Sequence, residues 1–219
     1  MQIIEFLKEY YTLFFVGLTL LTALFTVHKA LIFPFRWFAI LIILLAILET
    51  IASAIGFFYH IKNHFIFNII YILELLLVPF FFTYWLRRPW IKKVIRVYII
   101  IFILFVLINT LWIQGFFTLQ TYSFVLGGSF MLVLSVSYLW QLFTSEESQN
   151  IFRDPIFWFS LAYLLYFAVS VPYLGMLNYL WTNYPSFTTL YYELIFDATI
   201  CLFNVLLTIG FLCMKTKTR

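Results

Sequence analysis

Apolar residues run through this chain in continuous stretches separated by short polar connections. A bilayer core about 30 Å thick needs roughly 20 apolar residues in a helix. Stretches of this length predict helices over residues 9–28, 36–59, 65–85, 94–114, 119–142, 156–177 and 189–213. Because the stretches are continuous and do not alternate in polarity, they indicate helices and not the strands of a transmembrane barrel. The pattern therefore predicts an all-α, polytopic bundle of seven transmembrane helices, forming a single domain over residues 1–219.

Composition supports the membrane assignment. Hydrophobic residues make up 65% of the chain and charged residues only 10%, which is too little polar surface for a soluble domain. The longest connection, over residues 143–154, is too short to hold a separate domain. Any chemistry is therefore expected inside the bundle, and any cytoplasmic output is expected to pass through another protein.

The positions of Lys and Arg predict the orientation of the bundle. The side that holds the N-terminus and the even-numbered loops carries only Lys8 and Lys62. The other side carries the remaining cations, namely Lys29, Arg36, Arg87, Arg88, Lys92, Lys93, Arg96, Arg153, Lys215, Lys217 and Arg219. By the positive-inside rule, the N-terminus is outside and the C-terminus inside a cell inner (plasma) membrane, which the chain crosses several times.

The most basic segment is the loop over residues 87–93. Its cations and the next one along the chain, namely Arg87, Arg88, Lys92, Lys93 and Arg96, are candidates for contact with anionic membrane lipid or with an acidic face of a cytoplasmic partner. Each charge near an anionic bilayer surface contributes about 1 kcal/mol of attraction.

Four acidic residues lie inside the predicted spans, where no Lys or Arg lies at comparable depth: Glu49, Glu74, Glu193 and Asp197. An ionisable group in hydrocarbon costs from about 2.5 kcal/mol upward, so such groups usually face a bundle interior and mark a functional site. The alternative is a protonated carboxyl that hydrogen-bonds to the next helix, which is worth about 0.6 kcal/mol. Glu193 and Asp197 would repel each other if both were ionised, which favours a function for that pair.

Polar residues at helical spacing accompany these acids on three predicted helices. The second helix carries Glu49, Ser53, Gly56 and His60, the third Asn68, Tyr71 and Glu74, and the seventh Glu193, Asp197, Cys201, Asn204 and Thr208. If these three helices adjoin, they frame an outward-facing acidic cavity. The candidate residues for binding a small ligand or a proton are Glu49, Glu74, Glu193, Asp197, Asn204, Tyr71, Ser53 and His60.

Pro79 and Pro172 fall inside the third and sixth predicted helices. Each removes a backbone hydrogen bond and frees a carbonyl, that of Leu75 or of Ala168, so both prolines are candidate hinges. Gly127 and Gly128 in the fifth helix are expected to permit close helix packing.

Several kinds of chemistry find no support in the residues. His60 and His64 have the spacing of two metal ligands only if one helix continues through Asn63, and the short connection favours a turn there. No lysine lies within the seventh predicted helix to bind retinal, and no Ser-His-Asp arrangement or nucleotide fingerprint is present. We expect no catalytic activity, no cofactor, no metal and no nucleic-acid partner.

The segments NTLWIQG (residues 109–115), DPIFW (154–158), NYL (178–180) and FLC (211–213) resemble those of uncharacterised small seven-helix proteins of Bacteroidota. That resemblance implies a sensory role beside a cytoplasmic signalling protein such as a sensor histidine kinase. It assigns no catalytic residue.

The sequence thus favours a receptor-like or sensory membrane protein that signals through a separate cytoplasmic partner. The alternative is a small proton- or cation-coupled transporter or channel, although inverted repeats are not evident. A third possibility is an assembly subunit in which every buried acid only joins helices.

Overall fold

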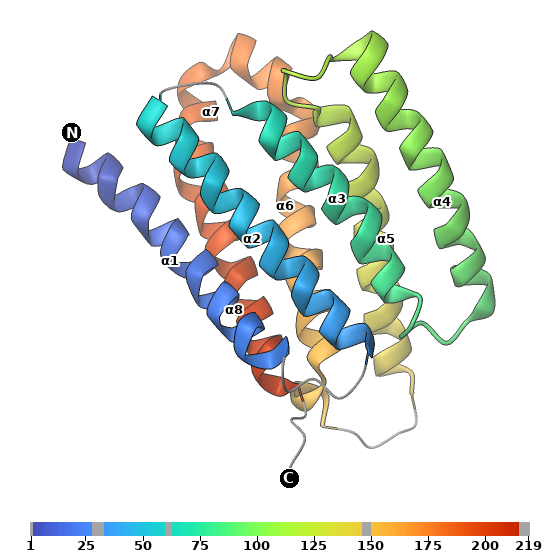
Figure 1. Cartoon of the computed structure of the whole chain (residues 1–219). Helices are drawn as coiled ribbons and strands as arrows, with labels where there is room; N and C mark the ends of the chain where they lie inside the picture. Colours follow the sequence, from blue (N-terminus) through green and yellow to red (C-terminus); the bar gives the residue numbers. More distant parts are fainter. Residues whose placement is uncertain (1, 28–32, 60–62, 146–149, 215–219) are drawn as a thin grey trace.

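The structure, a computed structural model, is an antiparallel bundle of helices (Figure 1). It describes the backbone of residues 2–27, 33–59, 63–145 and 150–214, and the side chains of these residues except 2–10, 57, 192 and 193. The elements in chain order are α1 (Gln2–Val27), α2 (Phe33–Tyr59), α3 (His64–Phe82), α4 (Pro89–Ile108), η1 (Asn109–Ile113), α5 (Thr121–Phe143), η2 (Ile151–Arg153), α6 (Pro155–Asn183), α7 (Pro185–Tyr191), η3 (Tyr192–Phe196) and α8 (Asp197–Cys213).

These elements make seven helical rods, because α4 continues into the π-helical turn η1 and the last rod is built from α7, the π-helical turn η3 and α8. The described residues contain no strand. The predicted all-α bundle of seven helices is therefore confirmed. Six of the rods are long and apolar enough to cross a membrane, and α1 contributes a shorter apolar segment, Tyr11–Val27.

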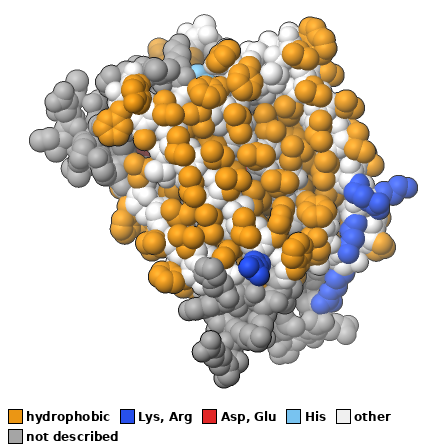
Figure 2. Space-filling view, viewed as in Figure 1, with side chains coloured by type: hydrophobic (Ala, Val, Ile, Leu, Met, Phe, Trp, Pro, Cys, Tyr) orange, Lys and Arg blue, Asp and Glu red, His pale blue; other side chains and the backbone are white. Residues whose placement is uncertain are grey.

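The surface of the bundle agrees with a membrane location. Figure 2 shows apolar side chains over most of the described part of one face, and Lys and Arg side chains near the start of α4 and at another place toward the same end. Beyond Arg96, the exposed residues of α4, such as Ile100, Leu104 and Leu107, are large and apolar. A surface of this kind is stable in lipid, where exposed apolar side chains cost nothing.

Several helix ends differ from the predicted ones. α1 begins at Gln2 and α6 continues to Asn183. α4 begins at Pro89, so Trp90, Lys92 and Lys93 belong to its first turns and not to a loop as the sequence suggested. Proline favours the first helical position because its missing N–H would have no partner there.

The rods form a ring. α1 packs against α2 and α8, α2 against α3, α3 against α5, α5 against α6, and α6 against α8. α4 lies outside this ring and packs on α3 and α5 (Figure 1). The assumption that the seventh helix adjoins the second and third is corrected, because α8 packs mainly on α1 and α6 and faces α2 and α3 across the interior of the ring.

Both candidate hinge prolines lie inside helices, as expected. Pro79 is buried in α3, and the carbonyl of Leu75 that it frees accepts a hydrogen bond from the Tyr98 hydroxyl on α4 at 3.1 Å. Pro172 lies on an exposed face of α6. The helices continue through both positions, and a hinge role stays a prediction.

Candidate functional site

A cavity of about 680 Å³ occupies the interior of the ring. Its walls come from α1, α2, α3, α6 and α8, together with η3, the α2–α3 connection and Leu119 just before α5. Its polar and ionisable lining consists of Thr12, Thr19, Glu49, Thr50, Ser53, Asn63, His64, Tyr71, Glu74, Tyr166, Tyr173, Asp197 and Asn204. The cavity extends from Leu207 and Ile42, below mid-bundle, to Asn63 and Trp181 at one end of the bundle.

That end lies opposite the basic end, by which we mean the end of the bundle that carries Arg36, Arg87, Arg88, Lys92, Lys93, Arg96 and Arg153. The mouth of the cavity and the exposed cations therefore lie at opposite ends. If the basic end is cytoplasmic, the cavity faces outward, which is the direction that the polar stripes predicted.

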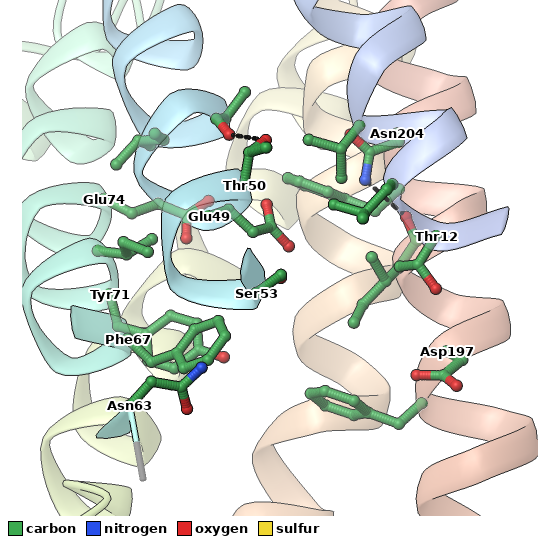
Figure 3. A pocket seen from close by; sticks show the side chains of 18 of the residues that line it. Thr12, Glu49, Thr50, Ser53, Asn63, Phe67, Tyr71, Glu74, Asp197 and Asn204 are labelled. Carbon is green, nitrogen blue, oxygen red and sulfur yellow. Dashed lines mark hydrogen bonds between the residues drawn. The ribbon is translucent and has the colours of Figure 1, made fainter. Parts of the chain in front are cut away.

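Glu49 of α2 and Glu74 of α3 are neighbours in the deep part of this cavity (Figure 3). The Glu74 side chain is only 7% exposed, and Glu49 is half-buried with its exposed part lining the cavity. The two carboxyl groups are close enough to interact electrostatically. Direct packing of α2 on α3 brings the pair together, so this part of the predicted convergence is present in the structure.

Three tyrosines surround the carboxyl pair. Tyr71 lies one turn from Glu74 on α3, and its hydroxyl lies near that of Tyr166 on α6. Tyr163, one turn from Tyr166, is fully buried, and its hydroxyl faces the Glu74 carboxyl. The two groups do not have the geometry of a normal hydrogen bond, and within the described residues the hydroxyl has no other partner. Tyr163 and Tyr166 could not be identified from the sequence, because nothing in their spacing separates them from the other tyrosines among the 15 in the chain.

Asp197 lines the same cavity from the opposite wall. Figure 3 shows it on α8, across from Glu49 and Glu74 and nearer to the end marked by Asn63. Its carboxyl interacts with the Cys201 thiol one turn away. Among the described side chains, the acids of the lining thus occupy two places in one chamber, with Glu49 and Glu74 deep in it and Asp197 closer to the mouth.

Part of the polar stripe on α8 is hydrogen-bonded to α1. The Thr19 hydroxyl of α1 lies 2.9 Å from Asn204 Oδ1 and 3.2 Å from the Thr208 hydroxyl, and Asn204 Nδ2 donates to the Ile200 carbonyl at 3.0 Å. Asn204 still lines the cavity, but these hydrogen bonds join α1 to α8. Thr19 could not be found by looking for a stripe, because most of α1 is apolar.

The remaining predicted site residues differ in where the structure places them. Ser53 lines the cavity one turn from Glu49. His60 lies outside the described residues, as does the side chain of Glu193. The backbone of Glu193 belongs to the π-helical turn η3, so the α-helical phase that was expected to align it with Asp197 is interrupted. His64 begins α3 after a break at Asn63, so one helix does not run from His60 to His64.

Four phenylalanines close the cavity toward the basic end. Phe38, Phe81, Phe159 and Phe211 belong to α2, α3, α6 and α8, and each is at most 1% exposed. The Phe38 ring lies 4.2 Å from that of Phe81 and 4.7 Å from that of Phe159, and the Phe159 and Phe211 ring centres lie 5.2 Å apart. We call these residues the phenylalanine cluster.

The cluster lies directly beneath the cavity lining. Phe38 is one turn from Ile42, and Phe211 is one turn from Leu207. Phe81 and Phe159 are two turns from Glu74 and Tyr166 respectively. Residues at these spacings share a helix face. The same faces that line the cavity therefore meet below it, where the buried phenylalanine rings pack against one another.

The basic residues proposed for partner or lipid contact are all exposed. The segment that carries them is fixed to α5, because the Arg87 backbone N–H donates to Gln141 Oε1 at 2.7 Å and Gln141 Nε2 donates to the Trp85 carbonyl at 3.0 Å. Arg87 and Arg88 lie before α4, whereas Lys92, Lys93 and Arg96 project from its first turns. Their contact with lipid or with a partner remains a prediction.

The chemistry of the site is that of an acidic chamber with aromatic walls. In the described part of the chain, no three His, Cys, Asp or Glu side chains are grouped closely enough to hold a metal ion. In comparisons with known proteins, no family model, no curated protein and no solved structure matches the chain.

Proposed function

We propose that this chain is a membrane-embedded sensory protein that binds a small molecule in its acidic cavity and signals through a cytoplasmic partner. The observation that carries the proposal is a cavity with Glu49 and Glu74 at its deep part and a phenylalanine cluster beneath them. A chamber that is closed at one end suits binding better than passage. The apolar surface and the helices that could span a bilayer support the membrane location.

The coupling runs through helices that contribute to both the cavity and the basic end. α3 carries Glu74 in the cavity wall and ends at the segment that leads to Arg87 and Arg88. A ligand that binds one packing of these helices more tightly than another shifts the population toward that packing. The partner reads the change at the basic end, and a sensor histidine kinase is the class of partner that we propose.

The test uses a variant whose own side chain fills part of the cavity. Ser53 lines the cavity, so Ser53→Phe places an aromatic ring where a ligand would bind. In a background without Cys201 and Cys213, the labelling rate of Arg88→Cys reports on the basic end. We expect Ser53→Phe to change that rate by about threefold or more, which corresponds to a shift in helix packing of about 0.7 kcal/mol or more. Val133→Phe, at an exposed position of α5, is the matched control and leaves the rate unchanged.

An unchanged rate in Ser53→Phe would show that the cavity and the basic end are not coupled. Flux provides the second readout. Proton or organic-cation uptake into proteoliposomes that Glu74→Gln abolishes would replace sensing by transport as the function. Absence of flux above that of empty liposomes agrees with a closed chamber.

A further inference from the structure

The cavity has a lining that selects for one class of ligand. We infer that it binds an organic cation with an apolar body, whose ammonium group lies between Glu49 and Glu74. This inference rests on the proposed function, since it names the ligand of that same cavity. It is carried by the charge of the lining, by the tyrosine hydroxyls around the carboxyl pair and by the apolar walls.

The charge of the lining is one-sided. Glu49, Glu74 and Asp197 are all acidic, and no Lys or Arg is among the described residues that line the cavity. His64 is the one basic side chain of that described lining, and it lies at the mouth, at the start of α3. Two carboxylates in apolar surroundings repel each other strongly, and an ammonium group between them removes that repulsion.

The Tyr163 hydroxyl is a second, independent indication of a ligand. Buried hydroxyls almost always have a hydrogen-bond partner, and one without a partner needs an explanation. Tyr163 is fully buried, faces the Glu74 carboxyl and has no partner within the described residues. A bound ammonium would keep Glu74 ionised, and a small movement of its side chain would let the Tyr163 hydroxyl donate to the carboxylate.

The walls fit an apolar body and not a bare metal ion. Aromatic side chains line the cavity that holds the carboxyl pair, including Phe67, Tyr71, Tyr166, Phe196 and Phe203. Aromatic faces attract ammonium groups and bury apolar surface at the same time. A volume of about 680 Å³ lies within the range of pockets for small organic ligands. Calcium, in contrast, takes about six to eight oxygen ligands.

The experiment compares two probes of nearly equal shape in the full-length protein reconstituted in nanodiscs. The probes are 2-phenylethylammonium and its neutral counterpart 2-phenylethanol, and binding is measured by calorimetry. We expect the amine to bind at least about tenfold more tightly than the alcohol, and Glu49→Gln or Glu74→Gln to remove most of that difference. Tyr163→Phe is expected to weaken the amine by about threefold and to leave the alcohol unchanged.

Asp154→Asn is the matched control, because it is an acid-to-amide change outside the cavity. Asp154 accepts hydrogen bonds from the Ile156 backbone N–H at 2.9 Å and from the Tyr138 hydroxyl at 2.7 Å, far from the lining. This variant should bind both probes like the unmodified protein. Circular dichroism of each variant separates lost binding from lost folding, and Tyr163→Phe remains informative if an acid variant fails to fold.

The outcomes separate the ligand class from the function. Equal binding of amine and alcohol, with no effect of either acid-to-amide change, would overturn the organic-cation assignment and leave the cavity as a binding site for neutral compounds. If neither probe binds, the organic-cation assignment fails. If Ser53→Phe also leaves the basic end unchanged, the sensory proposal fails with it.

Discussion

Small residues beside large rings determine how closely the helices of this bundle approach. A Cβ on Gly210 would overlap Phe159 Cε1, and a Cβ on Gly128 would lie 2.7 Å from Phe167 Cδ1. Gly127 is equally close to Leu75 of α3. The expectation that Gly127 and Gly128 permit close packing is therefore confirmed. Without a hydrophobic effect between helices in lipid, such van der Waals contacts carry much of the stability.

Gly210→Ala tests this at the position that supports the phenylalanine cluster. The added methyl group forces the Phe159 ring to move, and overpacking of this kind costs about 1–3 kcal/mol. We expect a lower thermal unfolding temperature in detergent. Gly17→Ala is the control, because nothing lies within 4 Å of its Cβ position, and it should not lower the unfolding temperature. Equal temperatures for the two variants would contradict the close packing.

Some residues of the site could be recognised from the sequence one at a time, and others could not. Glu49, Glu74 and Asp197 could be recognised from their depth in apolar stretches, because the cost of burying a charge depends on the local sequence alone. Tyr163 and Asn204 could not be assigned in the same way. The partner of Asn204 is Thr19 on a helix far away along the chain, and polarity alone does not reveal which buried polar group binds a ligand and which joins helices.

At the scale of elements, α3 and α4 are joined by a hydrogen bond that proline makes necessary. Pro79 lacks an N–H, so the Leu75 carbonyl would be unsatisfied in lipid without the Tyr98 hydroxyl. The Tyr98 ring stacks on Phe130 of α5 with ring centres 3.8 Å apart. This arrangement holds α4, which lies outside the ring, against the wall that carries Glu74.

A double-mutant cycle measures this link. Tyr98→Phe should destabilise the protein by about 1 kcal/mol, because it leaves the Leu75 carbonyl without a partner. Pro79→Ala restores the backbone N–H that can bond that carbonyl within α3. We therefore expect Tyr98→Phe to cost much less in the Pro79→Ala background. Unfolding free energies in mixed micelles give both values, and equal costs in the two backgrounds would show that the hydrogen bond does not depend on the proline. Tyr179→Phe, at an exposed position, is the control.

The existence of the helices followed from the length of the apolar stretches, but their ends did not. Pro89 begins α4 and places Trp90, Lys92 and Lys93 in its first turns, because the helix backbone continues into the headgroup region, where a count of apolar residues stops. A fixed helical period also could not predict the π-helical turn at Tyr192–Phe196. This turn changes the face of the helix on which Glu193 would lie.

At the scale of the whole molecule, the cavity mouth and the basic residues occupy opposite ends of the bundle. This separation suits a protein that receives a molecule on one side of a membrane and contacts a partner on the other. The orientation in the membrane can also be tested directly, because the positive-inside rule assigns the basic end to the cytoplasm.

Single cysteines test the orientation in intact cells. In a background without Cys201 and Cys213, we expect Thr182→Cys to react with a membrane-impermeant maleimide from outside, because Thr182 is exposed near the cavity end of α6. Arg88→Cys should react only after the cells are permeabilised. The opposite pattern would place the cavity mouth in the cytoplasm and exclude sensing of an external molecule through it.

The sequence by itself determined that this protein is a membrane bundle of seven helices with acids buried at bilayer depth. Both properties depend on the free energy of transferring a continuous segment from water to lipid, and the local sequence alone sets that free energy. Only the tertiary structure decided that α1 lies between α8 and α2, that α5 and α6 lie between α8 and α3, that Thr19 bonds Asn204, and that four phenylalanines meet below Glu74. Lipid and a neighbouring helix are equally apolar, so the hydrophobic pattern of a membrane helix does not specify which face meets which neighbour.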